Sequence, residues 1–128
     1  MDLMQVFKLE CCELNFKAKT KESAMQYLAK MMQRAESLQN IPQEDILAAL
    51  QERESKGSTA FGNGIAIPHC QLENIDSFAV GLAISPKGIE FDALDKKPSQ
   101  IFAIIVGPTN AAKDHLQLLA QISRILKE

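Results

Sequence analysis

An α/β fold, in which helices pack on a mixed β-sheet, is what the sequence predicts. Apolar residues recur at helical spacing in two consecutive segments of the first half, strand-like apolar runs follow, and one more helical segment ends the chain. Elements in this order are typical of a sheet whose apolar faces are covered by helices.

Length and composition restrict the chain to a small globular protein. Its 128 residues fit one domain spanning 1–128, and 46% hydrophobic with 23% charged residues is ordinary for a folded protein. A domain of this size buries about two-thirds of its unfolded surface, so it needs no disulfide or metal ion to fold. The net charge of −2 argues against nucleic-acid binding. The composition also excludes a disordered chain, a collagen and a coiled coil.

The sequence shows no membrane-spanning or signal segment. It contains no run of about 18 apolar residues. The N-terminal stretch carries Asp2, Lys8 and Glu10 in place of the apolar core of a signal peptide. We therefore expect a cytoplasmic protein without direct membrane insertion.

Cys11, Cys12 and Cys70 are expected to be ordinary packed thiols. Adjacent cysteines rarely bridge each other, and a reducing cytosol disfavours disulfides. Cys11 and Cys12 lack the two-residue spacer of a zinc knuckle, and the two histidines have no carboxylates nearby at ligand spacing. We expect neither a metal ion nor any other cofactor.

The first half of the chain predicts one strand and two helices. Val6–Phe16 suggests a strand, most clearly over Cys11–Phe16. Thr20 can cap the first helix, and Pro42 suits the first turn of the second, which should end before Gly57. The apolar positions follow steps of three and four residues: Ala24, Tyr27, Leu28, Met31, Met32 and Ala35 in the first helix, and Ile46, Leu47 and Leu50 in the second.

The second half predicts further strands and a closing helix. Ile65–Ile67 is a short apolar strand, and 78–84 and 100–106 are typical of strands. A turn with a short strand is expected around 86–91. The last helix begins at about Asn110, and its broad apolar face is expected to be buried: Leu116, Leu118, Leu119, Ile122, Ile125 and Leu126.

A glycine-rich segment, 57–64, joins the second helix to the short strand. Gly57 and Gly62 have the spacing of a phosphate-binding P-loop. However, Asn63 and Gly64 replace the Lys and Ser/Thr that this motif requires, and a strand follows instead of a helix. Nucleotide binding by that route is not expected. The glycines expose backbone N–H groups that can receive an anion, and a plain surface turn fits equally well.

His69 is the main candidate for chemistry. It follows Pro68 at the end of the short apolar strand, and a strand end places a side chain at the rim of a sheet, within reach of partners. A neutral imidazole is a good nucleophile toward phosphorus, because its ordinary pKa is about 6.5. A lone histidine is more often structural, but the preceding glycine-rich segment brings the two interpretations close to equal. Cys70 as a nucleophile with a histidine base is a weaker alternative.

His115 and Arg53 are the other candidates. His115 shares a helical stripe with Leu119 and Ile122, so its ring should point toward the sheet, as a core histidine would. Arg53 ends the second helix, where cations are favoured. Its guanidinium is either a solvated surface charge or a ligand for phosphoryl oxygens. Position in the sequence does not decide between these roles.

Several stretches together resemble a known family. Three of them are Arg53-Glu54, Gly57-Ser58-Thr59 and Gly62-Asn63-Gly64-Ile65-Ala66-Ile67-Pro68-His69. They resemble the signature of the enzyme IIA proteins of the bacterial phosphoenolpyruvate-dependent sugar phosphotransferase system, in its fructose/mannitol branch. This branch includes a nitrogen-related regulatory form. Residues 88–95 and 115–119 resemble later patterns of the same family, so the resemblance covers nearly the whole chain.

The resemblance implies a three-layer α/β/α sandwich that acts as a phosphohistidine carrier. His69 would accept a phosphoryl group on Nε2 from a phosphohistidine of the carrier protein HPr and pass it to a cysteine of a IIB domain. By the same resemblance, His115 lies beside His69 and Arg53 belongs to the site. Transfer of this kind depends on positioning and on charge stabilisation. We also expect phosphate contacts from the loop, at Ser58, Thr59, Gly62, Asn63 and Gly64.

The chain departs from the family pattern in two respects. Cys70 stands where relatives commonly carry Gly, and a positive φ there would strain it. The chain ends at Glu128, whereas relatives usually continue for about another helix, so we expect a domain shortened at the C-terminus. Packing over one face of the sheet would then be weaker, and an exposed apolar patch would favour self-association.

Two functions stay open at this point. The protein is either a phosphoryl carrier in sugar uptake or a regulatory module whose phosphorylation state controls binding to target proteins. No IIB domain or membrane segment is fused to this sequence, which slightly favours the nitrogen-related regulatory type. A purely structural domain is the weakest alternative, because His69, Arg53 and His115 are all present.

Overall fold

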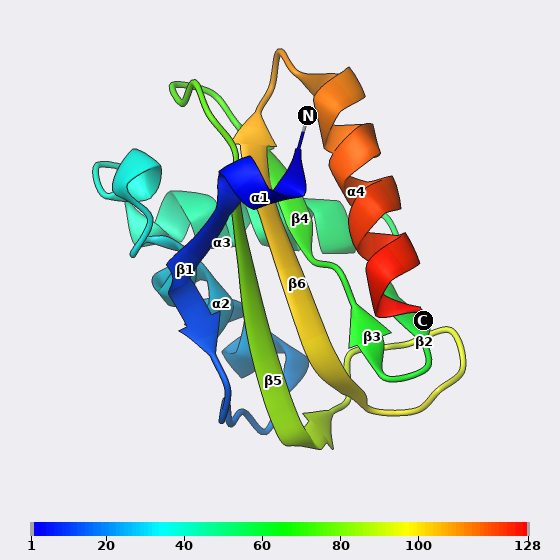
Figure 1. Ribbon diagram of the computed structural model, residues 1–128. Coiled ribbons are helices and arrows are strands. Elements are labelled where there is room, and N and C mark those ends of the chain that lie inside the picture. Colours follow the sequence, from blue (N-terminus) through cyan, green and yellow to red (C-terminus); the bar gives the residue numbers. More distant parts are fainter. Residues whose placement is uncertain (1, 128) are drawn as a thin grey trace.

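A mixed sheet of six strands forms the centre of the structure, a computed structural model that describes residues 2–127 (Figure 1). The elements, in chain order, are α1 (Leu3–Val6), β1 (Phe7–Glu13), α2 (Lys21–Met32), the 3₁₀ turn η1 (Glu36–Leu38), α3 (Gln43–Glu54), β2 (Ala60–Gly62), β3 (Ile65–Ala66), β4 (His69–Leu72), β5 (Ala79–Ile89), β6 (Ser99–Pro108) and α4 (Ala112–Leu126). None of the helices within residues 2–127 has both the length and the apolar character that crossing a bilayer requires.

The sheet is built around an antiparallel pair, β5 and β6. β1 lies beside β5 in parallel, and the order across the sheet is β1-β5-β6-β3-β2. β3 and β4 pair in parallel with successive parts of β6, from Ile65 opposite Ile101 to Leu72 opposite Pro108. They therefore act as one interrupted strand along the same side of β6.

Helices cover both faces of this sheet, which confirms the three-layer arrangement. Along β6, the side chains alternate between the two cores, as strand geometry requires. Phe102, Ile104 and Val106 belong to the core under α2 and α3. Ala103 and Ile105 belong to the core under α4, on the other face.

The helices α2 and α3 begin much as predicted. Thr20 forms a capping box with Ser23: Thr20 Oγ1 accepts from the Ser23 amide at 3.0 Å, and Ser23 Oγ accepts from the Thr20 amide at 3.2 Å. Pro42 precedes the first helical residue of α3 instead of occupying the first turn. Its carbonyl accepts from the Ile46 amide, and an N–H at this position would have no acceptor within the helix, so proline costs α3 no hydrogen bond.

Two strand predictions were wrong in their bounds. β1 ends at Glu13, so Phe16 lies beyond the strand. Phe16 is apolar like a strand residue because its ring packs in the core against Tyr27 and Phe102. The turn expected around 86–91 is absent, since β5 continues through Pro86 to Ile89. Proline is tolerated there because the β5–β6 register is irregular between Ile84 and Ile89.

The buried face of α4 is narrower than predicted. His115, Leu118 and Ile122 are buried, at steps of three and four residues, whereas Leu119 and Leu126 are half-buried. Leu116 and Ile125 are exposed, which corrects the prediction that they lie on the buried face. A single stripe of the helix rests on the sheet, and these two side chains lie outside that stripe.

An apolar cavity of about 320 Å³ lies between α1, α4 and the sheet. Its walls include Leu3, Val80 and Ile122, and the exposed Met4 and Ile125 border it. The weaker packing expected over one face stays a prediction. Self-association through this patch stays a prediction.

Candidate active site

His69 lies at an edge of the sheet, as the first residue of β4. The prediction that it ends a strand is therefore wrong, although its place at the rim is right. Pro68 has no N–H to donate, so β3 stops at Ala66 and regular pairing resumes at His69, opposite Ile105. The half-buried ring opens into a hollow of about 530 Å³ between α3 and α4.

Two hydrogen bonds determine which ring nitrogen of His69 is free to react. Nδ1 lies 2.7 Å from the carbonyl oxygen of Ile67, which can only accept, so Nδ1 carries the proton. Nε2 then has the lone pair, and it accepts from Nε of Arg53 at 3.2 Å. The nucleophilic nitrogen is therefore held toward a cation, with the backbone fixing the opposite side of the ring.

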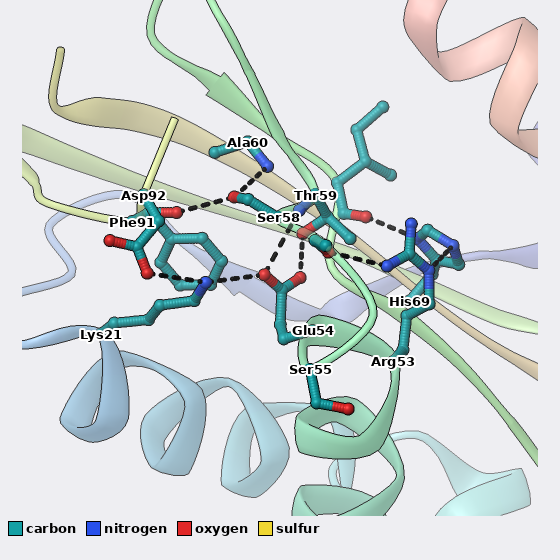
Figure 2. A network of polar contacts seen from close by, with 12 residues as sticks. Lys21, Arg53, Glu54, Ser55, Ser58, Thr59, Ala60, His69, Phe91 and Asp92 are labelled. Carbon is teal, nitrogen blue, oxygen red and sulfur yellow. Dashed lines mark hydrogen bonds and ion pairs between the residues drawn. The ribbon is translucent and has the colours of Figure 1, made fainter. Parts of the chain in front are cut away.

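Arg53 reaches this position from the last turn of α3. Its NH1 group donates to the carbonyl oxygen of Gly57 at 2.8 Å, and its Nε donates to His69. The guanidinium is thus oriented at two points, and donors of this kind can turn to the oxygens of a bound phosphoryl group. Figure 2 shows Arg53 beside His69, while Glu54 points to the opposite side of the same helix end.

His115 faces His69 from α4, as the helical stripe predicted. The two rings have centroids 5.3 Å apart, and the ring of Phe78 lies 5.8 Å from that of His115. His115 is only 4% exposed, yet neither ring nitrogen has a hydrogen-bond partner among residues 2–127. An unsatisfied buried polar group is costly, so this ring is suited to donate to a ligand held at His69.

Both imidazoles are neutral at pH 7. Burial lowers the pKa of His69 below its usual 6.5, and the positive charge of Arg53 lowers it further, while the hydrogen bond to Ile67 acts in the opposite direction. Burial, with the neighbouring His69, lowers the pKa of His115 to about 4. His69 therefore keeps its lone pair, and His115 keeps one N–H to donate.

We expect His115 to make the fold sensitive to acid. Its pKa is lower in the folded chain than in the unfolded one, so the unfolded chain binds more protons between pH 6.5 and about 4. The free energy of unfolding should fall across this interval by about 3 kcal/mol on account of His115. Urea unfolding at several pH values measures this loss. A His115→Gln variant with an equally steep fall would contradict the assignment.

Ser58 and Thr59 lie near His69, but their hydroxyl groups form hydrogen bonds with other residues of the chain. Both residues line a smaller hollow together with Arg53 and His69. Ser58 Oγ donates to the Phe91 carbonyl at 2.9 Å and accepts from the Ala60 amide at 3.1 Å. Thr59 Oγ1 donates to the carboxylate of Glu54.

Gly62 ends β2, Asn63 and Gly64 form the turn to β3, and none of the three lines a hollow that contains His69. Their φ values of +116°, +58° and +76° lie in the left-handed region that glycine and asparagine tolerate. The Asn63 amide does meet an anion, the carboxylate of Asp95, which accepts from it at 3.0 Å. The structure therefore gathers Arg53, Ser58, Thr59, His69 and His115, and sets this turn apart.

Cys70 is not strained by replacing glycine. It lies in β4 with a negative φ, is 4% exposed, and packs in the core under α2 and α3. Burial raises the pKa of its thiol to about 12, which makes it unreactive. Within residues 2–127 no three His, Cys, Asp or Glu side chains are grouped so as to hold a metal ion.

Sequence reasoning missed Glu54 and Lys21. Glu54 enters the sequence prediction only as part of the family signature, and Lys21 does not enter it. Their side chains form an ion pair of 2.9 Å beside Thr59, with only 6% of Glu54 and 17% of Lys21 exposed. The spacing of residues in the sequence does not reveal a contact between α2 and the end of α3. The only sequence signal for this ion pair is that an acidic residue, Glu54, directly follows Arg53.

Comparison with known proteins identifies the family of this chain. A family model described as "Phosphoenolpyruvate-dependent sugar phosphotransferase system, EIIA 2" matches residues 5–128. The chain belongs to this family. It is consequently a phosphoryl-transfer component of the EIIA kind, and the resemblance drawn from the sequence is confirmed.

The EIIA relatives carry two kinds of name. The chain is 35% identical over 125 residues to a fructose-specific EIIA component of Haloferax volcanii, covering 98% of this chain and 80% of the relative. It is 34% identical over 113 residues to a nitrogen regulatory protein of Pseudomonas aeruginosa, covering 88% and 72%. The crystal structure of the nitrogen regulatory protein IIA-Ntr from Neisseria meningitidis superposes with a TM-score of 0.89 at 26% identity, covering 97% of this chain and 83% of that one.

Proposed function

We propose that this EIIA domain is a phosphohistidine carrier and that His69 Nε2 accepts the phosphoryl group from phosphohistidine on HPr. The observation that carries the proposal is the state of Nε2. It is unprotonated and faces a guanidinium, with the unpartnered ring of His115 beside it. A nucleophile, a cation and a neutral donor then surround the space that a phosphoryl group would occupy.

The transfer step is a displacement at phosphorus. The lone pair of His69 Nε2 forms the new P–N bond as the P–N bond of the donor breaks, and the bonding pair returns to the donor imidazole, which takes up a proton from solvent. His69 keeps its Nδ1 proton, and the Ile67 carbonyl stabilises the positive charge that develops on the ring.

Arg53 and His115 would stabilise the charge on the phosphoryl oxygens. Arg53 exchanges its hydrogen bond with Nε2 for bonds to these oxygens while its NH1 group stays on Gly57. His115 donates one N–H, which satisfies a buried ring that is otherwise unpaired. Phosphate contacts from the loop, at Ser58, Thr59, Gly62, Asn63 and Gly64, stay a prediction.

Labelling with the complete donor chain tests the proposal. The protein is incubated with phosphoenolpyruvate, enzyme I and HPr, and the acid-labile phosphate is located by mass spectrometry and ³¹P NMR. We expect one phosphate, on Nε2 of His69. A lack of labelling, or labelling of His115 instead, would contradict the proposal.

The phosphoryl group either passes on to a IIB cysteine or stays on His69, where it acts as a regulatory signal that controls binding to target proteins. The match to the IIA-Ntr structure favours the nitrogen-related regulatory role slightly, and the fructose-specific relative keeps sugar uptake open. Mixing the labelled domain with IIB proteins separates the two, because a carrier for uptake discharges rapidly to a sugar-specific IIB. A carrier supplied from phosphoenolpyruvate would act in the cytoplasm, where that metabolite is made.

A further inference from the structure

A buried carboxylate at the end of α3 lies behind the site. Glu54 is the last residue of the helix and directly follows Arg53, but its side chain is turned away from His69 and is only 6% exposed. Lys21, from the first turn of α2, lies 2.9 Å from its Oε1 atom and is itself only 17% exposed. Burying such a pair is costly, so its retention calls for an explanation beyond simple charge pairing.

The carboxylate binds the loop that leads to the site. Glu54 Oε1 accepts from the Thr59 amide at 3.2 Å, and Oε2 accepts from the Thr59 hydroxyl (Figure 2). Thr59 is 5% exposed and therefore has no access to water as a substitute partner. Glu54 thus fixes the path of the chain from the end of α3 to Thr59.

Two branches run from this fixed loop to the ring of His69. In the first, the Thr59 carbonyl accepts from the Ile67 amide at 3.1 Å, and the Ile67 carbonyl accepts from His69 Nδ1 at 2.7 Å. The first branch therefore sets the tautomer of His69.

The second branch reaches the other side of the ring. The Gly57 carbonyl accepts from Arg53 NH1 at 2.8 Å, and Arg53 Nε donates to His69 Nε2 at 3.2 Å. Gly57 lies between Glu54 and Thr59, the two residues that the carboxylate joins. The second branch therefore orients the guanidinium.

We propose that Glu54, held by Lys21, is a positioning residue for phosphoryl acceptance: through Thr59 and Gly57 it orients both the His69 ring and the Arg53 guanidinium. This inference rests on the proposed function of His69. It predicts that loss of the carboxylate slows the transfer step and produces a mixture of His69 tautomers, and that docking of the donor stays unchanged.

The test compares Glu54→Gln with the matched control Glu44→Gln, an exposed glutamate at the other end of α3. Glutamine has nearly the same size but carries no negative charge, so it cannot form the ion pair with Lys21, and only one of its two terminal atoms can accept a hydrogen bond where Glu54 uses both. At saturating phospho-HPr we expect the single-turnover rate to fall at least about tenfold, because small misplacements of reacting groups have effects of this size. The half-saturating HPr concentration should stay within about twofold of the unmutated value.

A second measurement does not depend on phosphorylation. In ¹⁵N NMR of the free protein, His69 should carry its proton on Nδ1, and Glu54→Gln should produce a mixture of tautomers. Glu44→Gln should match the unmutated protein in both measurements. If the unmutated protein is not labelled at His69, the proposed function fails, and the tautomer alone decides the role of Glu54.

Two results would overturn the inference. One is an unchanged transfer rate and an unchanged tautomer in folded Glu54→Gln. The other is a slower reaction that arises only from a higher half-saturating concentration, which would make Glu54 a docking residue. If Glu54→Gln does not fold, Thr59→Val decides by the same two measurements, because it removes only the hydroxyl that Oε2 accepts from.

Discussion

Replacing His69 by alanine is expected to abolish acceptance of phosphoryl groups from phospho-HPr. The lone pair of Nε2 is the nucleophile. The neighbouring His115 does not replace it, because its ring is buried, with only 4% exposed to an incoming donor. Labelling with radioactive phosphoenolpyruvate in the presence of enzyme I and HPr measures the loss, which should be complete.

The His69→Ala variant should stay folded. The imidazole is half-buried at the edge of the sheet and opens into a hollow, so its removal leaves little new cavity in either core. Circular dichroism and urea unfolding check this point. His115→Ala is the control, since it removes a histidine of the same site and should still be labelled at His69, more slowly. Full labelling of folded His69→Ala would refute the assignment of the acceptor.

Replacing Arg53 by alanine is expected to slow phosphoryl transfer by about 10²–10³-fold without removing the acceptor. Loss of one well-placed donor to a developing negative charge has effects of this size. The variant loses the cation that lies 3.2 Å from Nε2 and the anchor on Gly57 together. Single-turnover labelling at saturating phospho-HPr measures the rate, and prolonged incubation should still label His69.

Arg53→Lys separates charge from geometry. Lysine restores a positive charge but cannot donate to Gly57 and to the site at the same time from a planar fork, so we expect only partial recovery. A fully recovered rate would show that charge alone matters. An Arg53→Ala rate equal to that of the unmutated protein would remove the guanidinium from the mechanism.

Local patterns were enough for α2 and for recognising the family motif. The cap at Thr20 and the three- and four-residue steps of α2 depend on neighbours in sequence, and the structure confirms them. Patterns failed where tertiary contacts set the outcome. An apolar residue at position 16 suggested a strand, but Phe16 lies outside β1 and fills the core through ring contacts with Tyr27 and Phe102. The exposure of Leu116 depends on how α4 rests on the sheet, which its own periodicity does not report.

The α/β class, the family and the identity of His69 as the acceptor candidate follow from the order of elements and from short motifs, because these are properties of adjacent residues. The surroundings of that histidine come from elsewhere. Arg53 belongs to α3, His115 to α4, and the carboxylate of Glu54 is paired with Lys21 of α2. Only folding brings these groups within hydrogen-bonding or ring-contact distance, and burial there lowers the pKa of both imidazoles. Chemistry at Nε2 depends on that shared environment, which no single segment of the chain contains.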